Sequence, residues 1–220
     1  DMQDNYAIDS LGRAIKAAKD GAFENEIQPV KLSLRGEQKT ILADEQPRNA
    51  KIDKIPSLKP AFKDGGTVTA ANSSSISDGA AAMVITKLSI AEQLGVTPLA
   101  TIVAHVTHAQ EPEWFTTAPI GAIKKVLEKT NWDKNDVDLY EINEAFSVVV
   151  LAALKELDLN REKVNIHGGA CAIGHPIGAS GARIIVTLMN SLEKYSLKKG
   201  VASLCIGGGE ATAIAIEKFH

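Results

Sequence analysis

The chain has 220 residues, 45% of them hydrophobic and 23% charged, which is enough for one large domain or two small ones. Its 24 basic and 27 acidic residues leave a formal charge of -3, which argues against a nucleic-acid-binding surface and against a basic membrane-surface patch. No apolar run approaches the ~18 residues that a membrane span needs, so no membrane partner is expected. The two cysteines cannot build a disulfide framework and favour a reducing compartment.

The first part of the chain is predicted to begin with a helix and to continue through irregular structure. Apolar residues at helical spacing run from Ile8 to Ala18, and Gly21 follows as a stop. Because the chain begins abruptly in this helix, without a leader, we expect a segment to be missing before it. Residues 32–60 carry charges and prolines with little periodicity and are expected to be loop-rich. The next predicted elements are a short strand at 67–70, a polar turn at 72–75 and a short helix at 89–94.

From residue 99 onward the sequence alternates between strand and helix patterns. Strands are expected at 99–106, 137–142 and 163–167. Helices are expected around 120–127, 144–157 and 182–192. Two further strands, 201–206 and 211–216, flank three glycines and predict a hairpin. This order predicts an α/β fold with a mixed sheet, largely parallel, to which the final hairpin adds an antiparallel strand, and with helices covering the sheet.

Three segments dense in chemically useful side chains each follow a predicted strand. They are Asn143–Phe146, Gly174–Pro176 and Cys205–Gly209. Ligands gather beyond the carboxyl ends of strands in open α/β sheets, so one site could collect all three segments. An imidazole can move a proton, a thiol with a lowered pKa can act as nucleophile or base, and an amide with glycine-flanked N–H groups can hold an oxyanion. This set fits acyl transfer or proton removal beside a thioester carbonyl.

Each of these residues also has a purely structural interpretation. His175 lies between a glycine and a proline, where histidine is often structural, and Cys205 lies in an apolar strand, where cysteine is usually core. Asn143 could be the N-cap of the helix expected from Glu144. The glycines could supply only backbone freedom. Taken one residue at a time, the sequence leaves these alternatives open.

The three segments, in this order and spacing, resemble the thiolase family. The matching strings are Asn-Glu-Ala-Phe at 143–146, Gly-His-Pro-Ile-Gly at 174–178 and Cys-Ile-Gly-Gly-Gly at 205–209. Residues 164–170 and 179–183 are similar to the biosynthetic acetoacetyl-CoA thiolases, and residues 67–79 resemble the family's pantetheine-tunnel segment. The resemblance covers essentially the whole chain. It implies a thiolase-like fold with the remainder of a loop domain at 1–66, a returning part of the N-terminal core domain at 67–98 and the C-terminal domain at 99–220.

The resemblance also implies a role for each matching residue. His175 would be the base that activates a nucleophilic cysteine and would later polarise a thioester oxygen, while Asn143 would hold a water that completes this first oxyanion hole. Cys205 matches the family's C-terminal reactive cysteine, which moves the α-proton. Gly207 would offer its backbone N–H to a second oxyanion hole.

The family's acyl-accepting cysteine lies in its N-terminal half and has no counterpart here. Cys171 occupies a position where the family usually has an aliphatic residue, and it is expected to be core. The resemblance therefore implies a C-terminal portion of a thiolase that is inactive alone. For coenzyme A, the matching residues are Ser74 at the pantetheine amide, Arg48 beside the adenine and Lys54 near the phosphates.

The activity implied for the complete enzyme is the condensation of two acetyl-CoA to acetoacetyl-CoA, and the reverse thiolysis. The resemblance calls for no metal or redox cofactor, and it implies a cytoplasmic homo-oligomer, dimer or tetramer, that acts in lipid metabolism. The alternatives are a 3-ketoacyl-CoA thiolase of fatty-acid degradation and a non-catalytic CoA-binding or scaffold fragment. A ketoacyl synthase is disfavoured, because those enzymes usually have a second histidine where this chain has Asn143.

Overall fold

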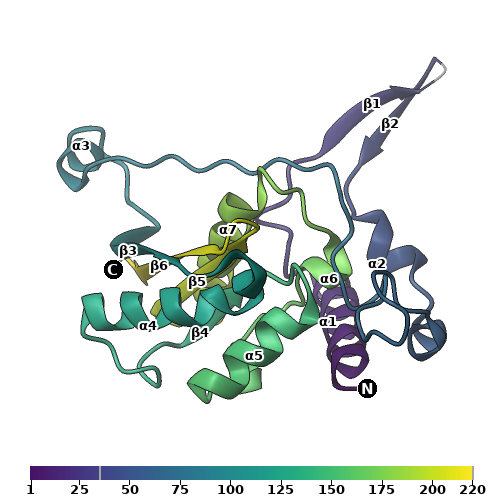
Figure 1. The fold of residues 1–220 in the computed structure, drawn as a ribbon. Helices are drawn as coiled ribbons and strands as arrows, with labels where there is room; N and C mark the ends of the chain where they lie inside the picture. Colours follow the sequence, from purple (N-terminus) through teal and green to yellow (C-terminus); the bar gives the residue numbers. More distant parts are fainter. Residues whose placement is uncertain (35, 220) are drawn as a thin grey trace.

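A four-stranded mixed sheet forms the centre of the molecule (Figure 1). The structure is a computed structural model that describes residues 1–34 and 36–219. The sheet has the order β3-β6-β5-β4, formed by β3 (Ala100–Ala109), β4 (Leu139–Ile142), β5 (Lys199–Ile206) and β6 (Glu210–Lys218). β4 and β5 are parallel, whereas β3 and β5 each pair antiparallel with β6. The predicted final hairpin is confirmed, but the sheet is less parallel than expected.

The sheet has fewer parallel pairs than expected because the strand predicted at 163–167 does not form. Val164 makes only an isolated parallel bridge to Tyr140, beyond which the chain turns at Asn165 (φ 47°) and Gly168 (φ 75°). The Asn165 side chain takes the place of a ladder, because its Oδ1 accepts from the N–H of Ile142 (2.8 Å) and its Nδ2 donates to the Ile142 carbonyl (2.7 Å). A side chain thus satisfies the backbone that a neighbouring strand would otherwise pair.

Helices cover both faces of the sheet (Figure 1). α4 (Ala118–Thr130) and α5 (Ser147–Leu157) contribute to a core with the buried Ile142 and Ala213, and α7 (Ser180–Lys194) packs its buried Leu188 on the opposite face. Short 3-10 helices lie at η2 (Pro112–Thr117) and η3 (Arg161–Lys163). The apolar residues of α7 recur at helical spacing, as the sequence predicts, so one side of the helix is buried.

The first helix joins this sheet domain rather than standing apart from it. α1 (Met2–Lys19) packs against α5 and against the one-turn helix α6 (Ala170–Ile173). The contact is close enough that a Cβ at Gly168 would collide with the backbone carbonyl of Ser10. The helix ends as predicted, just before Gly21, which has a φ of 66° that suits glycine.

Residues 30–57 contain more regular structure than predicted, and residues 67–70 contain less. A hairpin of β1 (Val30–Leu34) and β2 (Glu37–Ile41) extends from the body, followed by α2 (Glu45–Asn49) and η1 (Ile52–Ser57), in a region expected to be loop-rich (Figure 1). The predicted short helix is present as α3 (Leu88–Gln93). The strand expected at 67–70 is wrong: Thr69 makes one bridge to Pro60, and its N–H donates to the side chain of Asn72.

The segment between Ser77 and Lys87 runs extended above the sheet and carries exposed apolar side chains (Figure 1). Val84 is 97% exposed and Ile85 is also exposed, while Val68 and Met83 are partly buried. Among the described residues no element covers Val84. Exposed apolar side chains of this kind are typical of a segment that contacts another part of a protein or a partner. No helix in the described ranges is long and apolar enough to cross a membrane.

His167 is a buried histidine whose environment excludes a charge. Its ring lies between those of Phe23 and Tyr195, with centroid distances of 5.7 Å to each, and its buried Nε2 has no hydrogen-bond partner among residues 1–34 and 36–219. Burial, with the charges of Lys194 and Lys16, lowers the pKa of His167 from 6.5 to about 4. The folded protein therefore keeps this imidazole neutral where the unfolded chain takes up a proton.

We predict that His167→Phe reduces the loss of stability at acid pH in the intact protein. The variant keeps the aromatic contacts but cannot titrate. As pH falls from about 6.5 to about 4, the free energy of unfolding of the wild type therefore decreases relative to that of the variant. The gain is at most about 1.4 kcal/mol per pH unit. Denaturant unfolding of both proteins at pH 8, 6 and 5 measures this difference, and a difference that does not change with pH would contradict it.

Candidate active site

The segment that carries Asn143 is held against the neighbouring strand that carries Cys205. Asn143 follows the last residue of β4, and its backbone N–H donates to the Ser203 carbonyl of β5 (2.9 Å). Cys205 lies two residues further along β5. The N-cap interpretation of Asn143 is wrong, because α5 begins only at Ser147 with Phe146 as its N-cap residue. The Asn143 amide is therefore available for another partner.

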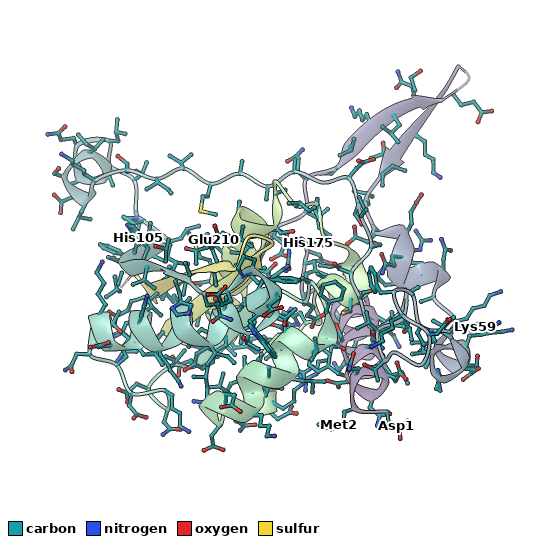
Figure 2. The ribbon with its side chains drawn as sticks, viewed as in Figure 1. Asp1, Met2, Lys59, His105, His175 and Glu210 are labelled. Atoms are coloured by element: carbon teal, nitrogen blue, oxygen red, sulfur yellow. The ribbon has the colours of Figure 1, made fainter. Side chains whose placement is uncertain are left out.

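His175 is held beside this amide by its own backbone and by the first turn of α7. Its N–H donates to the Ser75 carbonyl (3.0 Å), and a Cβ at the preceding residue, Gly174 (φ 92°), would collide with the Ser77 hydroxyl. The His175 Nε2 lies 3.4 Å from Asn143 Nδ2. Figure 2 shows His175 on the side of the sheet that faces the extended segment. The structure thus brings two of the predicted site residues together.

The hydrogen bonds of Ser180 define which nitrogen of His175 carries the proton. His175 Nδ1 lies 2.6 Å from the Ser180 Oγ, and this hydroxyl donates its only hydrogen to the Pro176 carbonyl (3.1 Å). The assignment that satisfies all of these groups has Nδ1–H donating to Ser180 and Nε2 accepting from the Asn143 Nδ2 donor. Burial and, to a smaller extent, the charge of Arg183 lower the pKa of His175, so the imidazole is neutral near pH 7. Its Nε2 can therefore accept a proton.

Cys205 is a protonated thiol in this environment. It is buried, and burial raises its pKa from 9.0 to about 11. An apolar strand interior disfavours the thiolate, so this thiol is protonated at neutral pH. Such a group can donate a proton to a leaving group, and it becomes a base only after it has done so.

Cys171 is buried, as expected for a core residue. Its Sγ lies 3.7 Å from the Glu144 carbonyl, and burial together with the Glu144 charge raises its pKa well above the ordinary value. A thiol in this position does not act as a nucleophile at neutral pH.

The glycine loop after β5 is shaped by Gly209 rather than by Gly207. Gly209 has a φ of 99°, and a Cβ there would collide with the Gln110 carbonyl. At Gly207 a Cβ would meet no atom within 4 Å, so packing does not require glycine there. A role for Gly207 therefore rests on its backbone N–H, as the sequence predicts, and stays a prediction.

The residues expected to bind coenzyme A separate into two groups. Ser74 is tied to the site, because both its N–H and its hydroxyl donate to the Ala145 carbonyl (3.0 Å each). Arg48 in α2 and Lys54 in η1 are exposed and lie outside this cluster. A cavity of about 400 Å³ opens beside His175, lined by residues 77–81 and 176–179.

Sequence reasoning missed two features of the site. Ser180, five residues after His175, fixes the tautomer of the imidazole, and its only sequence signal is its place at the start of an apolar helix. The Phe146 ring packs edge-on against Phe62 and Phe115, with centroid distances of 6.1 and 6.2 Å. The exposed Phe62 ring therefore extends an apolar wall that begins three residues after Asn143.

The raised pKa of Cys205 gives a measurable pH dependence. We predict that its alkylation by iodoacetamide in the intact protein accelerates about tenfold per pH unit from pH 7 and is still rising above pH 9. Mass spectrometry of the Cys205 peptide measures this rate, with Cys171 as the internal comparison that stays unmodified while the protein is folded. A rate that levels off near pH 8 would show that the thiol is not desolvated.

Comparison with known proteins agrees with this geometry. Residues 96–218 match the family model for the thiolase C-terminal domain, and residues 1–89 match that for the thiolase N-terminal domain. The chain is 48% identical over 220 residues to a probable acetyl-CoA acetyltransferase of Dictyostelium discoideum, covering 100% of this chain and 53% of that protein. It is also 48% identical over 218 residues to an acetyl-CoA acetyltransferase of Yarrowia lipolytica, covering 99% of this chain and 54% of that protein. The chain thus spans about half the length of these relatives.

Solved structures show the same fold. The crystal structure of the Bacillus anthracis acetyl-CoA acetyltransferase superposes with a TM-score of 0.96 at 43% identity, over 99% of this chain and 56% of that one. The human mitochondrial 3-ketoacyl-CoA thiolase superposes with a TM-score of 0.91 at 36% identity, over 98% of this chain and 55% of that one. The predicted family and the thiolase-like α/β fold are confirmed, and the chain belongs to the thiolase family.

Proposed function

We propose that this chain supplies the proton-transfer and oxyanion-binding residues of a site that condenses two acetyl-CoA into acetoacetyl-CoA and runs the reverse thiolysis. The observation that carries the proposal is the position of the His175 ring, whose Nε2 lies 3.4 Å from the Asn143 amide and whose Nδ1 lies 2.6 Å from the Ser180 hydroxyl. Acetyl-CoA acetyltransferases among the relatives support acetyl-CoA as the substrate. A nucleophilic cysteine would come from outside these 220 residues, since Cys171 is buried and Cys205 has another role.

The first half of the reaction forms an acyl-enzyme. His175 Nε2 takes the proton of the nucleophilic thiol, and the thiolate attacks the carbonyl carbon of acetyl-CoA. As the new carbon–sulfur bond forms, the bond to coenzyme A breaks. Cys205 gives its proton to the departing CoA thiolate and is left as a thiolate itself. The Gly207 N–H stabilises the oxyanion of this step, a contribution of roughly 3–4 kcal/mol for a donor of this kind.

The second half joins two carbons and returns both protons. The Cys205 thiolate removes an α-proton from a second acetyl-CoA, whose thioester oxygen accepts hydrogen bonds from protonated His175 and from a water on Asn143. The resulting carbanion attacks the acyl-enzyme carbonyl, and acetoacetyl-CoA is released as the bond to the nucleophilic cysteine breaks. His175 returns its proton to that cysteine. Every proton is accounted for, so the scheme uses no metal or redox cofactor.

The binding of coenzyme A and the setting of the enzyme follow the same proposal. Ser74 would contact the pantetheine amide, and Arg48 and Lys54, both exposed, would reach the adenine and phosphates. Residues 1–66, 67–98 and 99–220 would belong to the loop, N-terminal core and C-terminal core domains of a cytoplasmic homo-oligomer. A 3-ketoacyl-CoA thiolase is the second candidate, favoured by the similarity to the human mitochondrial structure. Relative rates on acetoacetyl-CoA and on a longer 3-ketoacyl-CoA distinguish the two.

The role of Cys205 is tested by Cys205→Ala in the intact protein. We expect condensation to be lost, because no group remains to remove the α-proton. Slow labelling by radioactive acetyl-CoA should persist, since a CoA thiolate can leave without a proton from Cys205. Cys171→Ala is the matched control and should retain condensation. Near-normal condensation by Cys205→Ala would refute the proposed base.

The role of His175 is tested without turnover. We expect His175→Ala to slow iodoacetamide alkylation of the nucleophilic cysteine at pH 7 by at least tenfold, because the thiol loses the base that takes its proton. His105→Ala, on the partly buried strand β3, is the control and should leave the rate unchanged. If the rate is unchanged in a folded His175→Ala protein, the histidine has only a structural role.

A further inference from the structure

A buried carboxylate that the scheme above does not use lies directly beside Asn143. Glu144 is fully buried, and no basic side chain forms a salt bridge with it among the described residues. Its oxygens accept four hydrogen bonds: at Oε1 from the Tyr6 hydroxyl (2.8 Å) and Asn165 Nδ2 (3.0 Å), and at Oε2 from the Ser10 hydroxyl (2.7 Å) and the Cys171 backbone N–H (3.0 Å). Hydrogen bonds thus provide the compensation that burial of a charge requires.

The donor set presents hydrogen-bond donors to both oxygens of Glu144. Asn165 Nδ2 and the Cys171 N–H can only donate, and Ser10 already accepts from the Gly169 N–H (3.1 Å), so its own hydrogen points to Glu144. The fit is close, because a Cβ at Gly169 would lie 2.5 Å from the Glu144 carboxyl carbon. The carboxylate therefore has a single arrangement in which all its partners are satisfied.

This carboxylate is connected to both Asn143 and His175. Asn143 precedes it in the chain, and Ile142 on the other side of Asn143 is fixed by two hydrogen bonds to the Asn165 side chain. Through the Cys171 N–H, Glu144 also holds α6, the single turn that leads through Gly174 into His175. Glu144 is thus an acceptor shared by the segments that carry the amide and the imidazole, in addition to the contacts of Asn143 with Ser203 and of His175 with Ser75 and Ser180.

We propose that Glu144 is a positioning residue that sets the separation of the Asn143 amide and the His175 imidazole, and that Tyr6 and Ser10 of α1 hold it in place. The catalytic value of this separation rests on the proposed function, whereas the positioning itself does not. Displacements of about 1 Å in such a pair can cost about a hundredfold in rate. The residues that support the site thus include Ser10 and Tyr6 of α1, which lie 134 and 138 residues before Glu144 in the sequence.

The variants Glu144→Gln and Ser10→Ala test the proposal in the intact protein. In Glu144→Gln the new NH2 group faces either Asn165 Nδ2 or the Cys171 N–H, neither of which can accept, so one contact becomes repulsive and the surrounding backbone must shift. We expect kcat to fall by about ten- to a hundredfold and KM for the CoA thioester to change less than twofold, because no group that contacts coenzyme A is altered. Ser10→Ala removes a single donor and should give a smaller loss of kcat with the same unchanged KM.

The control is Val126→Ala, which removes buried volume from α4 without touching Glu144 or its partners. It should lower the free energy of unfolding while leaving kcat unchanged. If Val126→Ala lowers kcat as much as Ser10→Ala at equal loss of stability, the role of Glu144 is only structural and the proposal is wrong.

A second readout does not depend on activity. The ¹⁵N resonances of the His175 ring report its tautomer and the environment of Nε2, and they are assigned by their absence in His175→Ala. We expect the Nε2 resonance to move in Ser10→Ala and in Glu144→Gln, and not in Val126→Ala. Should Glu144→Gln fail to fold, Ser10→Ala alone decides. An unmoved resonance overturns the positioning role even if the protein has no thiolase activity, and a moved one supports it in the same case.

Discussion

A single buried negative charge, the carboxylate of Glu144, ties together parts of the chain that lie far apart in sequence. An ion of this kind costs several kcal/mol to remove from water unless hydrogen bonds replace its hydration. The four donors come from α1, from the loop at Asn165 and from the first turn of α6, so the charge is satisfied only when all three have converged. The same three segments surround the site, so the contacts that satisfy this carboxylate also help to assemble the site.

Glu141, the neighbouring acid on β4, is buried like Glu144 but has a different set of partners. Glu141 is also buried, and its nearest basic partner is Arg183, with 3.8 Å between Oε2 and Nη1. Burial raises the pKa of Glu141 to about 8 despite this arginine. Glu141 is thus mostly neutral at pH 7, whereas Glu144, three residues further along the chain, accepts four hydrogen bonds. The Arg183 charge, only partly compensated, remains to help keep the His175 imidazole neutral.

The sequence predicts those parts of the fold in which side-chain periodicity reflects burial. α4, α7 and the β5–β6 hairpin lie where their patterns place them. The strands expected at 67–70 and 163–167 fail because Asn72 and Asn165 bond the backbone locally, which apolar patterns do not reveal. The β1–β2 hairpin is mostly exposed; β1 alternates apolar and polar residues over only five positions, and β2 is polar except for Ile41. Asn143, His175 and Cys205 stand out by residue type, whereas Tyr6 and Ser10 reach the site only through the tertiary fold.

The protonation states at rest determine the order of steps in the proposed scheme. The buried Cys205 keeps its proton, so it cannot begin by removing an α-proton, and His175 is the group that can accept the first proton. Cys205 becomes a base only after it has protonated a departing CoA thiolate, which requires that acylation has already occurred. Once formed, its thiolate lies in the same apolar strand that raises its pKa, and there it is a stronger base than an exposed thiolate would be. Burial of one thiol thus both delays carbanion formation until the acyl-enzyme exists and supplies the basicity that the step needs.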